Sequence, residues 1–292
     1  MFRKLVALFS ILSLLLVVGA YYRNGLKAKP KLNQQVSGIA EFRALCIGAA
    51  SDEAQFAQFK SHPIYTLFFE NVTQEEGEKM ITRINAKAPE LLTPKLLEKY
   101  RTTDQIGGPA VFPFEKIGSF SPATLRYLKI AADLQNEFGS LDGLHIIEIG
   151  GGHGSLCKLI HDIAMPASYT LVNNADTLAL AKRTLEAHGL KSIHHIAPEE
   201  LKKGHWDLAI SDYGFTESSS QLQQRYLAHV FNQTERGYLT CNFFAKHYRV
   251  RCWNKETLLK KLRRQKPSLT NRDEESATGP ENLIAIGGTR HS

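Results

Sequence analysis

The segment His145–Gly154 has the sequence HIIEIGGGHG. Its residue types and their spacing suit the binding of a ligand at a tight turn. An apolar run containing the acid Glu148 leads into the glycines, and a helix-like stretch opens at Ser155. This pattern predicts a strand, a tight turn and a helix N-terminus, where ligands of open α/β sheets bind. Glycine permits the sharp turn and lets a ligand approach the backbone closely. The candidate glycines are Gly150, Gly151, Gly152 and Gly154.

The spacing of these glycines excludes two familiar nucleotide-binding turns. A dinucleotide fingerprint places glycines at relative positions 1, 3 and 6, and position 6 counted from Gly150 is Ser155. A phosphate-binding P-loop ends in Gly-Lys-Ser or Gly-Lys-Thr, and neither follows here. The turn therefore indicates a different ligand.

Alternating elements surround this turn from Leu144 onward. Strands are expected at 145–149, 169–172, 192–196, 207–211, 237–242 and 283–286. Helices are expected at 155–163, from Asp176 as N-cap to His188, and at 221–231. Such alternation with short connections predicts an α/β fold, a parallel sheet with helices on both faces. The polar segment 266–280 is expected to be mobile.

The region before the sheet is predicted to be helical. Residues 38–105 read as short helices, and Thr73–Glu76 forms a capping box that opens a helix to about Ala86. Ser121 is the expected N-cap of a second helix, with Pro122 as its first residue and Gly139 as its end. The segment 102–118, rich in glycine and proline, reads as a loop.

The composition is that of an ordinary globular protein. The chain has 292 residues, 43% of them apolar and 22% charged, which suffices for one large core or a core with a smaller lobe. Part of the net charge of +7 lies in the run 255–266, which reads as a solvated helix face, with a basic face for a membrane surface or an acidic glycan as the alternative. Aromatic residues are absent from that run, so a nucleic-acid partner is not expected. The four cysteines form no Cys-x-x-Cys pair and suit a reducing compartment.

The N-terminus carries an apolar run, Leu5–Ala20, followed by two tyrosines. With the tyrosines the run reaches the lower bound of about 17 residues for a membrane-spanning helix. More positive charges follow the run than precede it, which favours a cytoplasmic location for the rest of the chain. We expect a single-pass anchor at 1–22 and a linker at 23–37. A cleaved signal peptide followed by secretion is the alternative, because Arg3 and Lys4 form a positive n-region.

An acid followed by Gly-x-Gly-x-Gly resembles motif I of S-adenosylmethionine-dependent methyltransferases. Further segments join it, at 106–109 (IGGP), 121–127 (SPATLRY), 211–217 (SDYGFTE), 225–226 (RY) and 237–242 (GYLTCN). In this order they resemble the bacterial family of sugar O-methyltransferases, over roughly residues 58–290.

The resemblance implies a Rossmann-like methyltransferase sheet at 141–292, preceded by a helical region at 38–140. It also implies methyl transfer from S-adenosylmethionine to a sugar hydroxyl of a glycan or polysaccharide precursor. Two alternatives stay open: a small-molecule or lipid-linked acceptor, and an inactive methyltransferase fold that only binds a partner.

The resemblance also assigns the cofactor residues. The glycines are expected to approach the amino-acid moiety of the cofactor, with Glu148 anchoring the loop. The family has an acid at the end of the second strand to hold the ribose hydroxyls, and here that position is Asn173. An amide loses the charge-assisted part of such a bond, so cofactor binding is expected to be weaker, or Asp176 to substitute.

Methyl transfer to an alcohol needs in-line positioning and is helped by a base. The candidates for the base are Asp212, Glu217, His153 and His247, of which Asp212 follows the fourth strand where the family has asparagine. Gly214 stands where the family has alanine. Glu217 is alternatively an acceptor-orienting residue or a helix cap. Some sugar methyltransferases use a divalent metal, so a metal stays open, but no ligand cluster in the sequence demands one.

Overall fold

The computed structural model describes residues 32–69, 71–243, 245, 250–274 and 281–288. One compact unit begins at Arg43 and runs to the C-terminus, while residues 32–42 form the first part of helix α2 (Leu32–Ser51). Within this described part of the chain, no helix combines the length and the apolar character needed to span a membrane. The predicted anchor at 1–22 and most of the predicted linker lie outside the described residues.

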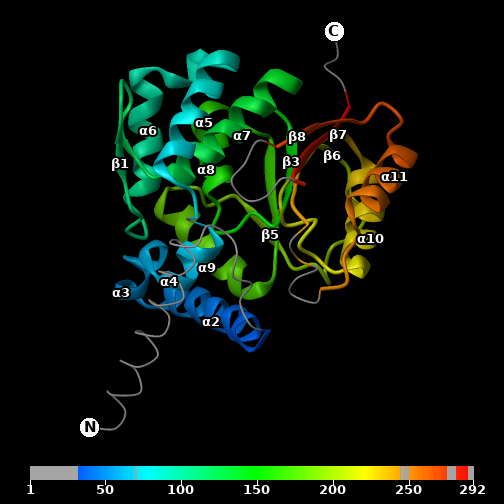
Figure 1. Ribbon diagram of the computed structural model, residues 1–292, viewed down its shortest axis with the longest axis horizontal. Helices are drawn as coiled ribbons and strands as arrows, with labels where there is room; N and C mark the ends of the chain where they lie inside the picture. Colours follow the sequence, from blue (N-terminus) through cyan, green and yellow to red (C-terminus); the bar gives the residue numbers. More distant parts are fainter. Residues whose placement is uncertain (1–31, 70, 244, 246–249, 275–280, 289–292) are drawn as a thin grey trace. The chain divides into compact units, whose positions relative to one another are not determined.

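A seven-stranded sheet forms the centre of the unit, in the order β5-β4-β3-β6-β7-β9-β8 (Figure 1). The five strands from β5 to β7 are parallel, and β9 and β8 are antiparallel to their neighbours. The strands are β3 (His145–Ile149), β4 (Ser168–Val172), β5 (His194–Ile196), β6 (Trp206–Asp212), β7 (Thr234–Cys241), β8 (Thr270–Asp273) and β9 (Leu283–Gly287). The predicted α/β sheet is confirmed as mostly parallel. The prediction for 266–280 was wrong at β8, because a polar edge strand gives no apolar alternation in the sequence.

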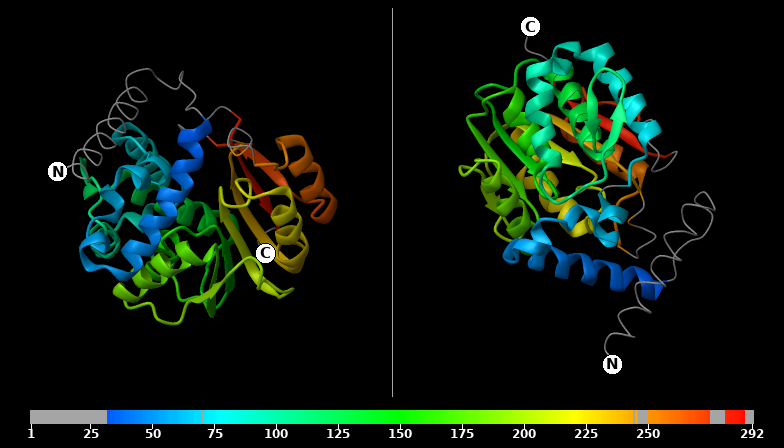
Figure 2. Two further views of the ribbon diagram at one scale, coloured as in Figure 1. Left: turned by 90° about the horizontal axis from the view of Figure 1, so that it is seen from below. Right: turned by 90° about the vertical axis from the view of Figure 1, so that its left-hand side faces the viewer.

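Helices cover both faces of this sheet (Figures 1 and 2). One face is covered by α5 (Gln74–Lys87), α6 (Pro94–Asp104), α7 (Pro122–Phe138), α8 (Ser155–Ile163) and α9 (Ala175–Ala187), and the other by α10 (Ser220–His229) and α11 (Lys255–Gln265). Consecutive strand residues face opposite sides of a sheet. Ile146 therefore joins the core under α7 and α8, while Ile147 joins the core under α10 and α11.

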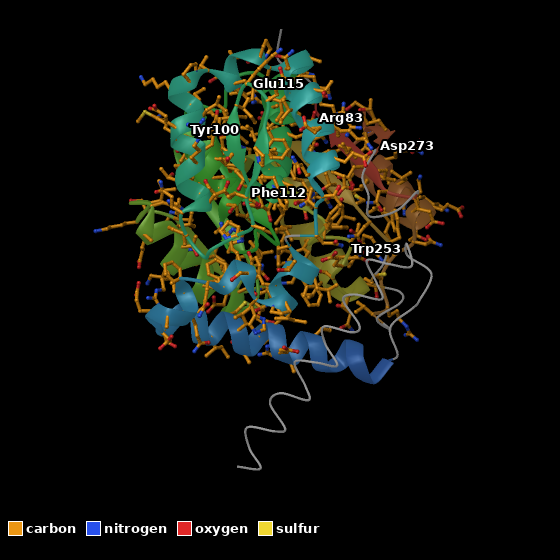
Figure 3. The ribbon with its side chains drawn as sticks, turned by 60° about the vertical axis from the view of Figure 1, so that its left-hand side comes forward. Arg83, Tyr100, Phe112, Glu115, Trp253 and Asp273 are labelled. Carbon is orange, nitrogen blue, oxygen red and sulfur yellow. The ribbon has the colours of Figure 1, made fainter. Side chains whose placement is uncertain are left out.

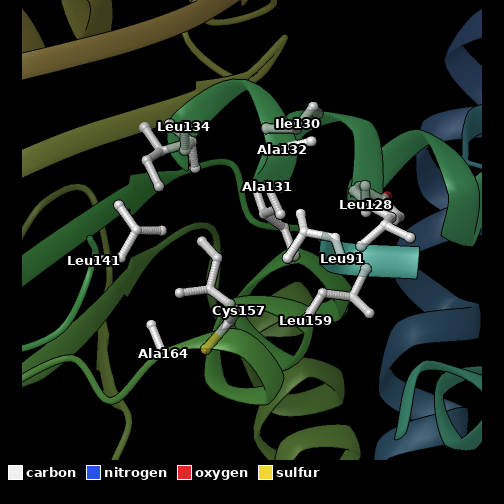
Figure 4. Close-up of a cluster of buried hydrophobic side chains, with 14 of the residues drawn as sticks. Leu91, Leu128, Ile130, Ala131, Ala132, Leu134, Leu141, Cys157, Leu159 and Ala164 are labelled. Carbon is white, nitrogen blue, oxygen red and sulfur yellow. The ribbon is translucent and has the colours of Figure 1, made fainter. Parts of the chain in front are cut away.

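Helix α7 is buried along most of its length because it lies between the sheet and the outer helices α5 and α6. Figure 4 shows its apolar side chains, among them Leu128, Ala131 and Leu134, packed with Cys157 and Leu159 of α8. Cys157 is fully buried, as expected of a small core residue. The Ser121 cap, the first-turn proline and the Gly139 stop of α7 are all confirmed.

The capping box at Thr73 is also confirmed, with both of its reciprocal bonds formed at the start of α5. The predicted cap of α9 was wrong by two residues. Asn174 is the N-cap, and its Oδ1 accepts from the backbone N–H of Thr177. Asp176 instead lies in the first turn of the helix.

Residues 102–118, predicted as a loop, contain one strand of a hairpin, β1 (Phe112–Phe114), paired with β2 (Gly118–Phe120). The hairpin forms because Phe114 and Phe120 are buried against the helices, and Phe114 fills the space beside Gly77 of α5. Figure 3 shows Phe112 and Tyr100 on the side of the sheet that α5, α6 and α7 cover, and Trp253 towards the opposite side, beside α11. The basic run is α11, which buries Leu258 and Leu262 and exposes most of its charges, as predicted.

A buried carboxylate on α7 joins this helix to its neighbours. Asp133 is 1% exposed, and its ion-pair partners come from α5, α7 and β8. They are Lys87, Lys129 and Arg272. The Tyr238 hydroxyl of β7 also donates to this carboxylate at 2.6 Å. Burial would raise the pKa of Asp133, but the lysines outweigh it and hold the pKa at about 2.

Candidate functional site

The glycine loop joins the carboxyl end of β3 to the N-terminus of α8. Gly150, Gly152 and Gly154 all adopt positive φ, at 80°, 52° and 91°. Side chains other than glycine are strained in that region of conformational space. The loop is further fixed by its own backbone, since the Gly152 N–H donates to the Gly150 carbonyl at 2.7 Å. The sequence therefore needs glycine at these positions to turn from strand to helix.

A second loop, residues 212–217 after β6, lies directly against the glycine loop. A Cβ built on Gly214 would lie 2.6 Å from the Gly150 Cα and 2.8 Å from the Ile149 carbonyl oxygen. Both neighbours are backbone atoms, so no side chain can move aside. The loop is anchored by Ser211, whose Oγ donates to the Ile149 carbonyl and accepts from the Phe215 N–H. Gly214, where the resembled family has alanine, is therefore explained by backbone contact.

Glu148 lies beneath the glycine loop and is 1% exposed. A Cβ on Gly151 would come within 2.9 Å of its carboxyl group, so this acid requires a glycine above it. The Tyr169 hydroxyl donates to Glu148 Oε2 at 2.8 Å. Burial raises the pKa of Glu148 to about 8, although the bond from Tyr169 opposes the shift. The position of Glu148 suits the predicted role of loop anchor.

Asn173, which is predicted to contact the ribose, is fixed by a hydrogen bond from Asn174. Asn173 follows β4, and its Oδ1 accepts from the Asn174 N–H at 2.8 Å. Because this bond engages the amide oxygen, Asn173 can offer a ligand its amide nitrogen as a hydrogen-bond donor. Asp176, the predicted substitute for the missing acid, forms an ion pair with Arg43 of α2 at 2.5 Å. A ligand that used Asp176 would have to compete with this arginine.

Asp212, the last residue of β6, forms a buried ion pair with Arg126 of α7. Its Oδ1 also accepts from the Thr240 hydroxyl. Burial would lower the pKa of Arg126, but the negative charge of Asp212 outweighs it and raises the pKa well above its ordinary value. Arg126 further lies over the Tyr213 ring at 4.6 Å. The Asp212 carboxyl group is therefore held in place by Arg126 and Thr240.

Tyr213 adopts a φ of 61°, a strained conformation for a residue other than glycine. Its hydroxyl donates to Glu274 Oε2 at 2.6 Å, and the Asn282 amide donates to the same oxygen at 3.2 Å. Burial raises the pKa of Glu274, although the charge of Arg126 lowers it. Strain of this kind gathers at functional sites.

Glu217 ends the same loop, and the residue as a whole is exposed although its carboxyl group packs against the protein. Burial of the carboxyl group raises its pKa, a bond from Asn242 opposes the shift, and the charge of Asp212 adds to it. That bond runs from Asn242 Nδ2 to Glu217 Oε1 at 2.8 Å. A raised pKa brings a carboxylate closer to the range in which it can accept a proton at neutral pH.

His153, a candidate base, is instead a buried part of the core. Its Nδ1 bonds with the Tyr65 hydroxyl and its Nε2 with the Ser155 hydroxyl. Burial holds the pKa of His153 well below its ordinary value, so the ring stays neutral. Tyr65 belongs to α4 (Pro63–Phe68), and the ring of Phe69, directly after it, would lie 3.0 Å from a Cβ on Gly152. Helix α4 thus covers the glycine loop.

The structure brings Asp212 and Glu217 together beside the glycine loop. His247, the remaining candidate base, lies outside the described residues. Among the residues that are described, no group of three or more histidine, cysteine or acidic side chains could hold a metal ion. No sequence signal marks Glu274 or Phe69, because each reaches the site from a distant part of the chain. Asn242 ends the segment GYLTCN, but the segment alone gives this residue no role.

Comparisons with known proteins were made at the level of sequence and of structure. No protein-family model and no curated protein sequence matches the chain. Among solved structures, the N-terminal domain of EvdMO1 in the presence of SAH and D-fucose is 15% identical. That match covers 67% of this chain and 96% of the other, with a TM-score of 0.45.

Two solved methyltransferases are similarly distant. The methyltransferase domain of bacterial CtHen1 is 16% identical over 56% of this chain and 97% of its own, with a TM-score of 0.42. The T. thermophilus 16S rRNA N2 G1207 methyltransferase, in complex with AdoMet and guanosine, is 17% identical. That match covers 62% of this chain and 46% of the other, with a TM-score of 0.41. These values describe a distant likeness of fold.

Proposed function

We propose that this protein is an S-adenosylmethionine-dependent O-methyltransferase that acts on a sugar hydroxyl of a glycan precursor. The observation that carries the proposal is the backbone contact between Gly150 and Gly214. This contact places the glycine loop and the acidic loop 212–217 side by side at the carboxyl edge of the sheet. Ligands of open α/β sheets bind at that edge. The membrane anchor and cytoplasmic location remain predictions from the sequence.

The residues at this edge fit the proposed cofactor in two respects. The glycines form a cradle whose surface a Cβ would fill, since one on Gly152 would lie 3.0 Å from Phe69. The cradle also leads into the N-terminus of α8, whose backbone N–H groups favour a carboxylate. Asn173 follows the neighbouring strand β4, where it can donate to a ribose oxygen.

When bound, the cofactor would supply an electrophilic methyl group for transfer to the acceptor oxygen, and the hydroxyl proton would need an acceptor. We assign the acceptance of that proton to Glu217, whose raised pKa and position on the loop beside the glycine turn suit the role. Asp212 is held by Arg126 and Thr240, so we assign it the orientation of the acceptor. His153 takes no part in proton transfer, because both ring nitrogens are engaged.

Calorimetric titration of S-adenosylhomocysteine into the full chain tests the cofactor site. We expect binding with a micromolar Kd, about −8 kcal/mol. Gly152→Val should abolish this binding, because the valine side chain would occupy the space above the loop. Gly189→Val is the matched control, since Gly189 also has a positive φ, 80°, but no atom within 4 Å of its Cβ position. Wild-type affinity in Gly152→Val, or no binding by the wild type, would contradict the proposal.

The catalytic assignment is tested by methyl transfer from labelled S-adenosylmethionine to a panel of glycosides. Glu217→Gln should lower kcat by about 10²–10⁴-fold, the usual contribution of a general base, and leave the affinity for S-adenosylhomocysteine unchanged. Asp212→Asn should mainly raise the KM of the acceptor. Full turnover by Glu217→Gln would remove this residue from the mechanism.

A further inference from the structure

The acidic side chains at the edge of the sheet form one electrostatic cluster. Asp212, Glu217 and Glu274 lie close enough that the charge of Asp212 raises the pKa of each of the other two. Arg126 is the cation that acts on all three. Among the described residues that interact in this way, three carboxyl groups therefore face the Arg126 guanidinium, and the Lys129 ammonium also acts on Glu274.

Each carboxyl group of the cluster has a different ion-pair or hydrogen-bond partner. Asp212 takes the Arg126 guanidinium, and Glu274 takes the Tyr213 hydroxyl at 2.6 Å. Glu217 is the most exposed residue of the three, and Asn242 Nδ2 donates to its Oε1 at 2.8 Å.

Asn242 supplies a second and independent observation. This residue is 4% exposed, and its Oδ1 has no hydrogen-bond partner among the described residues. Buried acceptors of this kind are rare in native structures, and each calls for an explanation. Because the same amide donates to Glu217, the unpaired oxygen lies beside that carboxyl group. Two acceptors thus stand next to each other with no donor assigned to one of them.

We infer that Glu217 and Asn242 bind adjacent hydrogen-bond donors of the acceptor, two hydroxyls or a hydroxyl and an amine, and that the site selects a neutral or amino sugar over a uronic acid. This inference rests on the proposed function and specifies its substrate class. Neighbouring hydroxyls satisfy both oxygens. A uronate carboxylate has no proton to donate, so it would leave the buried Asn242 oxygen unpaired and set its own oxygens against an acceptor.

Ligand-observed NMR on the full chain saturated with S-adenosylhomocysteine tests the inference. The probes are methyl glycosides of the gluco, manno and galacto series, each as the neutral, 2-amino and uronic acid form. We expect the neutral or amino form to bind at least tenfold more tightly than the uronate. Equal or tighter binding of the uronates overturns the inference, as does the absence of binding by every neutral and amino form.

A variant pair separates this inference from the proposed function. Asn242→Ala should weaken binding of the neutral glycoside by about tenfold, with the affinity for S-adenosylhomocysteine unchanged. Asn271→Ala is the matched control, because Asn271 is exposed on β8 and bonds to Arg263. Unchanged glycoside binding in Asn242→Ala overturns the inference alone. Failure of the wild type to bind S-adenosylhomocysteine overturns the proposed function first.

Discussion

Replacement of Gly214 by alanine tests the contact on which the site is built. The new Cβ would lie 2.6 Å from the Gly150 Cα, whereas ordinary contact begins at 3.4 Å, so the two loops must separate by about 0.8 Å. Gly214 has no positive φ, so the cost is steric alone. Overpacking of a well-packed region costs about 1–3 kcal/mol. For a chain of this size each kcal/mol lowers the Tm by about 2–4 °C.

The assay is chemical and thermal unfolding of the two proteins side by side. Gly237→Ala is the matched control, because Gly237 is buried, has no positive φ, as Gly214 has none, and its Cβ position lies 3.5 Å from the nearest Phe231 atom. We expect this control to be neutral or slightly stabilising, since alanine restricts the unfolded chain. Gly214→Ala as stable as Gly237→Ala would refute the argument, because the loops would then tolerate a methyl group between them.

Three further substitutions test buried polar groups by urea unfolding across pH. Burial raises the pKa of Glu148 to about 8, so the folded state binds the extra proton. The free energy of unfolding should therefore fall as the pH rises from about 4.5 to 8, by at most about 1.4 kcal/mol per pH unit. Glu148→Gln should remove that slope, and an unchanged slope in the variant would contradict the prediction. Asp133→Asn should cost about 3–5 kcal/mol at pH 7, since it leaves the buried Lys129 ammonium without its carboxylate. In the wild type the contribution of Asp133, whose pKa is about 2, should disappear as the pH falls from about 4 towards 2. Tyr65→Phe should cost about 1–3 kcal/mol by leaving His153 Nδ1 without its partner, and a stability equal to wild type would show that this bond contributes nothing.

The sequence predicts local elements well where a local signal exists. The strand at 145–149 and the helix at 155–163 were predicted to the residue, because apolar strand residues, glycines and a helix start follow one another directly. The Thr73 capping box is equally local, since both of its bonds join residues three apart. Such features need no knowledge of the rest of the fold.

Features that depend on distant partners could not be predicted in this way. Strand β8 exists because its backbone pairs with β9, although its own side chains are polar and largely exposed. Asp212 was identified as a candidate base, but its ion pair with Arg126 joins residues 86 positions apart. Likewise, His153 stands in the motif like a reactive group, and only the packing of α4 shows that it is buried. The sequence therefore predicts which residues gather beside the turn, while the contacts that each of them makes depend on the tertiary structure.

Helix α7 has a consequence for how such a protein can change over evolutionary time. Arg126 and Asp133 lie two turns apart on this helix. Each has partners on strands that follow much later in the chain, Asp212 for Arg126 and both Arg272 and Tyr238 for Asp133. The helix therefore cannot be exchanged as part of an independent module, because a transplanted copy would leave two buried ions without counterparts. Recombination at the start of the sheet, near residue 141, should yield chains that do not fold. New substrate preferences are then expected to arise by point substitution around an inherited frame.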